Sequence, residues 1–308
     1  MRVSVLGAGS RLGQVVVGKL IAAGHEVTAV GDQHTLDLTR DLTASKARAV
    51  TETQLRLALR ATQAVVNLLP LVDGPPPSWF TTRRRRRARH SRMSILDNAL
   101  AAAPAGVRWV HRSSASVYPD AGHTWIGEDL PTHPHRLTNE VLYAESASRT
   151  DTHSEDAVLR LGHLWGVADI PTINWLRAAG NGWDVLELPE DAYWPMLELS
   201  DAADAFCRAL TAAPGTYNVA DANPLTAADI TNLLVAAFGR RKLHPSGGLI
   251  FPRDAHLYYR SHRLDSSRFA LASGWAPACG PFPIALAERA AQLLDVPHRL
   301  RLRLEVPW

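Results

Sequence analysis

Residues 1–30 read MRVSVLGAGSRLGQVVVGKLIAAGHEVTAV. The apolar run that ends at Leu6 predicts a strand, and the glycines between Gly7 and Gly13 predict a tight turn. Residues 14–23 carry apolar side chains at helical spacing, and residues 25–30 predict a second strand. Strand, turn, helix and strand in this order predict one βαβ unit at the start of the chain.

The same alternation continues along the chain. Helices are predicted at 52–60, 91–103, 173–179, 201–210 and 227–238, and strands at 64–69, 107–112, 158–161 and 216–219. Alternating strands and helices predict an α/β fold: a Rossmann-type, doubly wound parallel sheet with ligands at the carboxyl ends of its strands. We expect a dinucleotide-binding domain over 1–160, completed by segments near 196–220. A smaller C-terminal substrate lobe is expected over 161–308.

Composition narrows the class of protein. The chain has 308 residues, 46% of them hydrophobic. Its 33 Lys and Arg nearly balance 30 Asp and Glu, so the net charge does not by itself indicate a nucleic-acid partner. Only Cys207 and Cys279 are present, which suggests neither disulfides nor a thiolate metal site and fits a reducing cytoplasm. The apolar runs 3–6 and 64–72 are too short for a signal peptide or a membrane span.

The glycine turn is the first chemical signal. A dinucleotide pyrophosphate binds backbone N–H groups at a helix N-terminus, after one glycine that makes the turn and before another that lets helix and strand touch. Gly7 and Gly13 meet these demands, although a plain strand-to-helix turn would look similar. We therefore expect NAD or NADP, held by these residues: Gly7, Gly9, Ser10, Arg11, Leu12 and Gly13, with Asp32 and Leu69. Asp32 follows the second strand and would accept from an adenosine ribose, which favours NAD, but it could equally be an ordinary turn residue.

Further motifs follow in a fixed order: 6–13 (LGAGSRLG), 65–70 (VVNLLP), 107–118 (VRWVHRSSASVY), 128–131 (EDLP), 159–166 (LRLGHLWG), 199–205 (LSDAADA), 216–219 (TYNV), and 265–268 (DSSR) with 274–275 (GW). In this order they resemble the extended short-chain dehydrogenase/reductase family, the NAD-dependent epimerases and dehydratases, over essentially the whole chain. The resemblance implies the Rossmann fold, a nicotinamide cofactor and a small-molecule substrate. The family's middle glycine falls at Ser10, whose hydroxyl would meet, or donate to, the pyrophosphate.

The resemblance also implies a catalytic triad that is incomplete here. Ser114 matches the family's serine, which hydrogen-bonds the reacting oxygen of the substrate. The family's Tyr and Lys, four residues apart on one helix, fall at Leu137 and Val141 when its Ala-Glu pair is aligned with Ala144 and Glu145. Lysine occurs only at positions 19, 46 and 242. The usual proton relay is therefore predicted to be missing. The Asp-Glu pair of the dehydratases is missing too, because Ala115-Ser116 follows the serine.

Weaker candidates could supply chemistry instead. Tyr143 could act as an acid from the same helix, although a place in the core is the alternative. Other side chains with suitable pKa ranges are Glu140, Glu145, His111 and His163. No metal site is expected, because His133 and His135 lack a third ligand.

Three segments are distinctive by composition. Aromatic residues gather in the expected substrate lobe, either as core or as walls for a flat, apolar ligand: Trp165, Trp175, Trp183, Tyr193 and Trp194. Five consecutive arginines form either a solvated helix face or a clamp for a phosphate or an acidic partner: Arg83, Arg84, Arg85, Arg86 and Arg87. Residues 299–305 alternate charged and apolar, which favours an edge strand that could pair in a homodimer.

Three functions remain open at this point. The first is an enzyme that acts on a small biosynthetic intermediate by isomerisation, cyclisation or elimination, with Ser114 in the site and the cofactor structural, vestigial or absent. The second is an NAD(P)-dependent oxidoreductase or epimerase with a replacement proton relay. The third is a non-catalytic nucleotide sensor or partner-binding protein.

Overall fold

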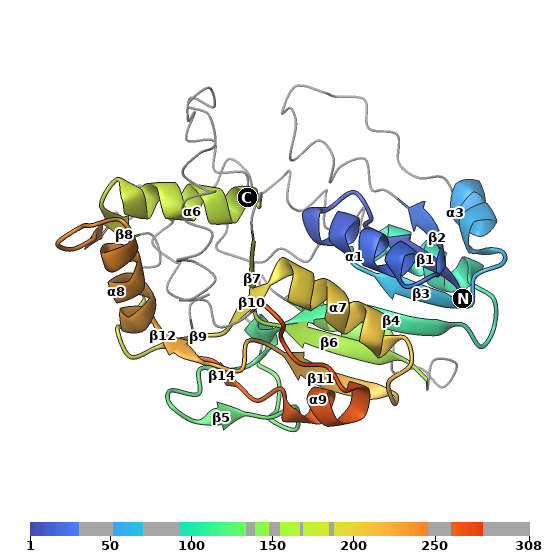
Figure 1. Cartoon of the computed structure of the whole chain (residues 1–308). Coiled ribbons are helices and arrows are strands. Elements are labelled where there is room, and N and C mark those ends of the chain that lie inside the picture. The colour runs from blue at the N-terminus through green and yellow to red at the C-terminus, as the bar shows by residue number, and fades with distance from the viewer. Residues whose placement is uncertain are drawn as a thin grey trace, which may run out of the picture.

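The computed structural model describes residues 1–30, 52–69, 93–133, 139–147, 155–166, 169–184, 188–245 and 260–279 (Figure 1). The helices within these ranges are α1 (Arg11–Ala22), α3 (Glu52–Leu59), α5 (Asn139–Ala147), α6 (Ile170–Gly180), α7 (Leu199–Ala209), α8 (Ala227–Ala237) and α9 (Ser267–Ser273), with a helical stretch over 93–102 and a 3₁₀ turn, η2 (Ala115–Val117).

The main sheet is parallel throughout. Within the described ranges it contains six strands in the order β11 (Gly215–Val219), β6 (Ala157–Leu161), β4 (Arg108–Ser114), β3 (Ala64–Asn67), β1 (Arg2–Leu6) and β2 (Glu26–Val30). The chain runs from β1 outward to β2 and then crosses back to β3 on the other side of β1. This order confirms the predicted doubly wound, Rossmann-type sheet.

Both faces of the sheet are covered because its strands are apolar on both sides. Val5 of β1 and Val66 of β3 face α1 and α7, which pack side by side on one face (Figure 1). Leu6 and Val65, the neighbours of those residues, belong to a second cluster with α3, the helix over 93–102 and α5. Since successive side chains of a strand point to opposite faces, continuous apolar runs such as 64–66 are what a sheet between two helical layers requires.

A smaller lobe lies beside the carboxyl ends of the strands. In Figure 1 it contains α6 and α8, on the left. Its short strand pairs are β7 (His163–Trp165) with β10 (Met196–Glu198), β8 (Trp183–Asp184) with β13 (His244–Pro245), and β9 (Tyr193–Trp194) with β12 (Leu225–Thr226). A further pair, β5 (Trp125–Ile126) with β14 (Arg263–Leu264), lies beneath the main sheet in the same view.

Side-chain hydrogen bonds shift the predicted boundaries by two or three residues. α1 begins at Arg11 and not at 14, because Ser10 caps it by accepting the N–H of Gly13 at 3.0 Å. β3 ends at Asn67 and not at 69, because the N–H of Leu69 turns to the side-chain oxygen of Asn67 at 3.2 Å.

None of the helices in the described ranges is both long and apolar enough to cross a membrane.

Candidate functional site

The glycine loop follows β1, the strand that has β2 on one side and β3 on the other. Leu6, the last residue of β1, pairs with Val30 of β2 on one side and with Asn67 of β3 on the other. The loop after β1 and the residues after β3 therefore lie next to each other at the carboxyl edge. This is the topological switch point, where parallel α/β sheets bind their ligands.

Two glycines in the loop cannot be replaced without moving the backbone. Gly7 has φ +78°, and a Cβ on it would lie 2.9 Å from the carbonyl carbon of Leu68. A Cβ on Gly13 would lie 2.4 Å from the carbonyl oxygen of Gly7. The loop is thus pressed against the residues after β3 and against the first turn of α1, which is the close approach that the sequence pattern predicts.

Ser10 closes the loop from within. Its hydroxyl donates to the carbonyl oxygen of Gly7 at 2.8 Å and accepts the N–H of Gly13 at 3.0 Å. The hydroxyl hydrogen is therefore engaged inside the loop, and a bond from Ser10 to a phosphate would require that hydrogen bond to break. Ser10 is therefore the N-cap of α1.

An anion at this place would meet the start of α1. The first intrahelical bond of α1 runs from the N–H of Gln14 to the carbonyl oxygen of Ser10 at 2.9 Å, so the N–H groups of Arg11 and Leu12 precede the ladder. Both are donors at the positive end of the helix dipole. The Arg11 side chain is exposed and donates to Gln14 at 3.3 Å, while the amide of Gln14 also donates to the carbonyl oxygen of Gly9 at 3.3 Å.

Ser114 lies at the carboxyl end of β4. It caps η2, and its hydroxyl accepts the N–H of Ser116 at 3.3 Å. The residue is 7% exposed, so little of it reaches the surface. Its position on the strand next to β3 puts it at the same sheet edge as the glycine loop.

A buried ion pair fixes the register of α5 over β4. The carboxylate of Glu145 accepts from Nε and Nη2 of Arg160 on β6, at 2.9 and 2.7 Å, and from the hydroxyl of Ser113. Val141 is one helical turn earlier on the same face, is 1% exposed and belongs to an apolar cluster with Ala115. An aliphatic group therefore stands one turn from Glu145, beside the end of β4.

Tyr143 faces another direction. Its hydroxyl donates to the carboxylate of Asp97 on the helix over 93–102, and its ring packs against the apolar cluster on that face of the sheet. The hydrogen bond to Asp97, with a smaller effect of burial, raises the pKa of Tyr143 to about 12. A phenol with this pKa gives up its proton less readily than an ordinary tyrosine.

The candidate histidines are parts of packed structure. His163, half-buried on β7, stacks on Trp194 with ring centroids 3.4 Å apart, and burial together with nearby His262 lowers its pKa to about 3. His111 is fully buried on β4 and stacks on Trp109, with ring centroids 5.3 Å apart.

The aromatic residues of the smaller lobe divide between core and surface. Trp165 and Trp194 are buried in one cluster with Leu176 of α6 and Ile230 of α8, and Trp175 packs against that cluster. Trp183 is 47% exposed. The guanidinium carbon of Arg263 lies 4.2 Å from the ring centroid of Trp125 and 4.9 Å from that of Tyr193. The interpretation of Trp165 and Trp194 as core is the one that this packing favours.

Some expectations lie outside the described residues: Asp32, Arg83, Arg84, Arg85, Arg86, Arg87, Leu137, His135 and the segment 299–305, together with the side chain of Glu140. Within the described ranges, one group of side chains could bring three metal ligands together, namely Glu198, Asp201 and Cys279. Both carboxylates there accept backbone N–H groups, at the start of α7 and at residues 278–279, which accounts for their burial without an ion.

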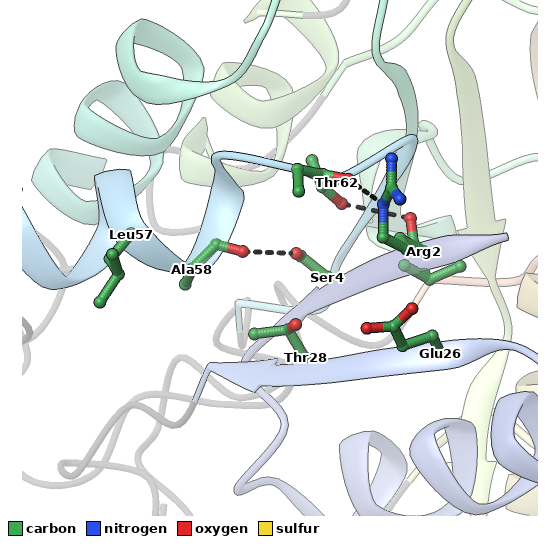
Figure 2. Close-up of a pocket in the computed structure, with 9 residues that line it drawn as sticks. Arg2, Ser4, Glu26, Thr28, Leu57, Ala58 and Thr62 are labelled. Atoms are coloured by element: carbon green, nitrogen blue, oxygen red, sulfur yellow. Dashed lines mark hydrogen bonds between the residues drawn. The ribbon is translucent and has the colours of Figure 1, made fainter.

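A hollow of about 300 Å³ lies near the amino ends of β1 and β2. Figure 2 shows it between α3 and the first residues of β1 and β2, with Arg2, Glu26, Leu57 and Thr62 around it. These residues stand at the amino ends of the strands or beside them. The hollow is therefore at the opposite edge of the sheet from the glycine loop, where this fold does not place its ligands.

Asn67 and Arg160, two buried polar residues near the site, are not among the predicted site residues. Asn67 ends the buried strand AVVN, and Arg160 interrupts the buried strand AVLRL. A polar residue inside an otherwise apolar strand is a signal that a buried partner exists. The signal does not reveal which partner, because Arg160 meets Glu145 only through the packing of α5 on the sheet.

The sequence matches no protein-family model, and a comparison with curated proteins also finds no match. Solved structures are similar over nearly the whole chain. Human epimerase family protein SDR39U1, solved with NADPH, is 23% identical at a TM-score of 0.74, covering 94% of this chain and 99% of that one. UDP-glucose 4-epimerase of Thermus thermophilus, solved with NAD, is 18% identical at 0.71, covering 96% and 100%. UDP-N-acetylglucosamine 4-epimerase of Bacillus cereus is 20% identical at 0.67, covering 95% and 99%. With its glycine loop at the switch point and its smaller lobe beside the sheet, the chain has the fold of the short-chain dehydrogenase/reductase epimerases.

Proposed function

We propose that this protein is an NAD(P)-binding enzyme of the extended short-chain dehydrogenase/reductase type that acts on a small molecule. The observation that carries the proposal is the loop between Gly7 and Gly13, where a side chain on either glycine would collide with backbone. The loop leaves the N–H groups of Arg11 and Leu12 for a pyrophosphate. Similar structures solved with NADPH or NAD support the same choice of ligand.

A bound nicotinamide ring can supply hydride exchange, but in a reaction without hydride transfer it would have only a structural role. The residues of this chain would then bind and orient the substrate. Ser114, at the end of β4, would hold the reacting oxygen of the substrate. Val141 offers neither a charge nor a proton one turn before Glu145, so a proton relay along α5 has no ammonium at that place. This favours a reaction that needs positioning more than proton relay, such as isomerisation, cyclisation or elimination.

Hydride transfer with a different proton relay is the second candidate. Its support comes from the structural neighbours, several of which are named epimerases of nucleotide sugars. The proton would then come from the substrate itself or from a residue other than the one at position 141. A non-catalytic nucleotide sensor would share the glycine loop but would not need Ser114.

Thermal shift with NAD, NADH, NADP and NADPH tests the first step. A nucleotide at a hundred times its dissociation constant should stabilise the fold by about 2.7 kcal/mol. No shift with any of the four would contradict the proposal. Incubation of the protein with nucleotide sugars, followed by mass spectrometry and by absorbance of the nicotinamide, then separates the reactions. Product of unchanged redox state without a transient absorbance change favours isomerisation, and a change in absorbance favours hydride transfer. Ser114→Ala should abolish either reaction but should leave a sensor's affinity unchanged.

A further inference from the structure

Asn67 links the residues after β3 to a buried histidine. The residue is 2% exposed and ends β3. Its side-chain oxygen accepts the N–H of Leu69 at 3.2 Å, and its side-chain nitrogen is 3.2 Å from Nδ1 of His111 on β4. His111 is fully buried, and its Nε2 faces the carboxylate of Asp156 at 3.7 Å. That carboxylate also accepts the N–H of Trp109 at 3.1 Å.

The donor and acceptor in each hydrogen bond of Asn67 follow from which atoms carry hydrogen. A backbone N–H can only donate, so the atom of Asn67 that faces Leu69 must be the oxygen. The amide nitrogen, which also can only donate, then faces Nδ1 of His111, and Nδ1 must be the ring nitrogen without a proton. The proton of the neutral imidazole is therefore on Nε2, toward Asp156. Leu69, Asn67 and His111 are therefore joined by two hydrogen bonds with a single consistent direction. The carboxylate of Asp156 lies 3.7 Å beyond Nε2 of His111, which is too far for a hydrogen bond.

The Leu68–Leu69 peptide, whose N–H is bound by Asn67, lies directly against the glycine loop. A Cβ on Gly7 would lie 2.9 Å from both the carbonyl carbon and the carbonyl oxygen of Leu68, and 3.1 Å from the N of Leu69. Because the C=O and N–H of a trans peptide point in opposite directions, fixing the N–H of Leu69 on Asn67 turns the carbonyl of Leu68 toward Gly7. The N–H of Leu68 meanwhile donates to the carbonyl oxygen of Leu6 at 2.9 Å.

We propose that Asn67 is a positioning residue of the dinucleotide site, and that His111 holds its amide in the one orientation that locks the Leu68–Leu69 peptide against Gly7. The inference rests on the proposed function, since it concerns the affinity for NAD(P). Without the acceptor on Asn67, the peptide can rotate and the wall of the glycine loop is lost. Asn67 itself does not touch the nucleotide in this role.

Replacement of Asn67 tests the role through nucleotide affinity. Asn67→Ala should weaken binding of the preferred nucleotide by about tenfold, the equivalent of one hydrogen bond. Asn67→Asp keeps the acceptor for Leu69 and can pair with an imidazole that has gained a proton on Nδ1, so its affinity should stay within about threefold of that of the native protein. Ser4→Ala is the matched control: it removes the hydrogen bond of another buried side chain, from Ser4 to the carbonyl oxygen of Ala58 at 3.1 Å, on neighbouring β1. Its affinity should not change.

Two further measurements keep the inference open to refutation if Asn67→Ala does not fold. His111→Phe retains a ring beside Trp109 but removes the acceptor for the amide of Asn67, and it should also weaken nucleotide binding. In the native protein, ¹⁵N resonances of His111 should show the proton on Nε2. Native affinity in both Asn67→Ala and His111→Phe, or a proton on Nδ1 of neutral His111, would overturn the positioning role alone. Failure of the native protein to bind any of the four nucleotides would overturn the proposed function, and the positioning role with it.

Discussion

Arg160 and Glu145 form a two-pronged ion pair in the interior, with each side chain 2% exposed. The remaining Nη1 of Arg160 donates to the hydroxyl of Tyr118 at 2.8 Å, and that hydroxyl donates to Asn218 of β11 at 2.7 Å. Burial alone would lower the pKa of Arg160, but the carboxylate of Glu145 raises it above its ordinary value. The pair thus ties α5 to β6 and β11, beneath the turn that Ser114 caps.

Glu145→Gln should be strongly destabilising. It removes the negative charge but leaves the buried guanidinium of Arg160 in place, and breaking one side of a buried pair costs about 3–5 kcal/mol. Denaturant unfolding measures this loss. Lys19→Met is the control, because the pair between Lys19 and Asp204, at 3.8 Å, is about one-third exposed and should contribute less than about 1 kcal/mol. Equal losses in the two variants would show that burial does not strengthen the dependence on Glu145.

The sheet and the glycine loop can be predicted from the sequence because both depend on patterns of neighbouring residues. Apolar runs, their spacing, and the glycines at 7 and 13 determine β1, α1 and the turn between them. The pair of Arg160 with Glu145 depends on how α5 packs over the sheet, and no local pattern contains that packing. The contact between Asn67 and His111 depends on the register of β3 on β4, which a sequence does not state.

Gly13→Ala should damage both stability and nucleotide binding. The new methyl group would lie 2.4 Å from the carbonyl oxygen of Gly7, so the loop must move, at about 1–3 kcal/mol. We expect a lower melting temperature and loss of the thermal shift caused by nucleotide. Gly18 is on the same helix, and in the described part of the chain no atom beyond its neighbours and its own helix backbone lies within 4 Å of an added Cβ. Gly18→Ala should therefore stabilise the protein by about 0.5–1 kcal/mol. A Gly13→Ala protein with native affinity would refute the tight-loop argument.

The orientation of side chains around a helix also depends on tertiary packing. Val141, Tyr143 and Glu145 lie within five positions on α5, yet Glu145 points to the sheet and Tyr143 to Asp97. Each residue turns the side chain by about 100° around an α-helix. The alignment of Ala144 and Glu145 with the family that the sequence resembles placed the family's Tyr and Lys at Leu137 and Val141. It did not predict what the opposite face would meet.

Tyr143→Phe tests whether this phenol acts as an acid. The hydroxyl of Tyr143 donates a hydrogen bond to Asp97, and the variant loses this bond. We therefore expect a larger loss in the free energy of unfolding than in turnover. The pKa of Tyr143 is raised to about 12 from an ordinary value of 10.0, so its contribution to stability is complete below pH 10 and disappears as pH rises toward 12. The difference in unfolding free energy between native protein and variant should follow that course. Loss of turnover with unchanged nucleotide affinity would instead assign Tyr143 a catalytic role.

His262 should make the protein sensitive to acid. Burial, as the main cause, lowers the pKa of His262 to about 4, and burial also lowers that of His163 to about 3. Because the unfolded chain takes up these protons near pH 6.5, stability should be complete above pH 6.5 and should fall as the pH drops toward 4 and then 3. His262→Gln should remove one proton from the pH dependence of unfolding in that range, as measured by denaturant unfolding at a series of pH values. His244→Gln, at an exposed position on β13, is the control and should leave the native slope. An unchanged slope in His262→Gln would mean that the imidazole of His262 is accessible to protons in the folded protein.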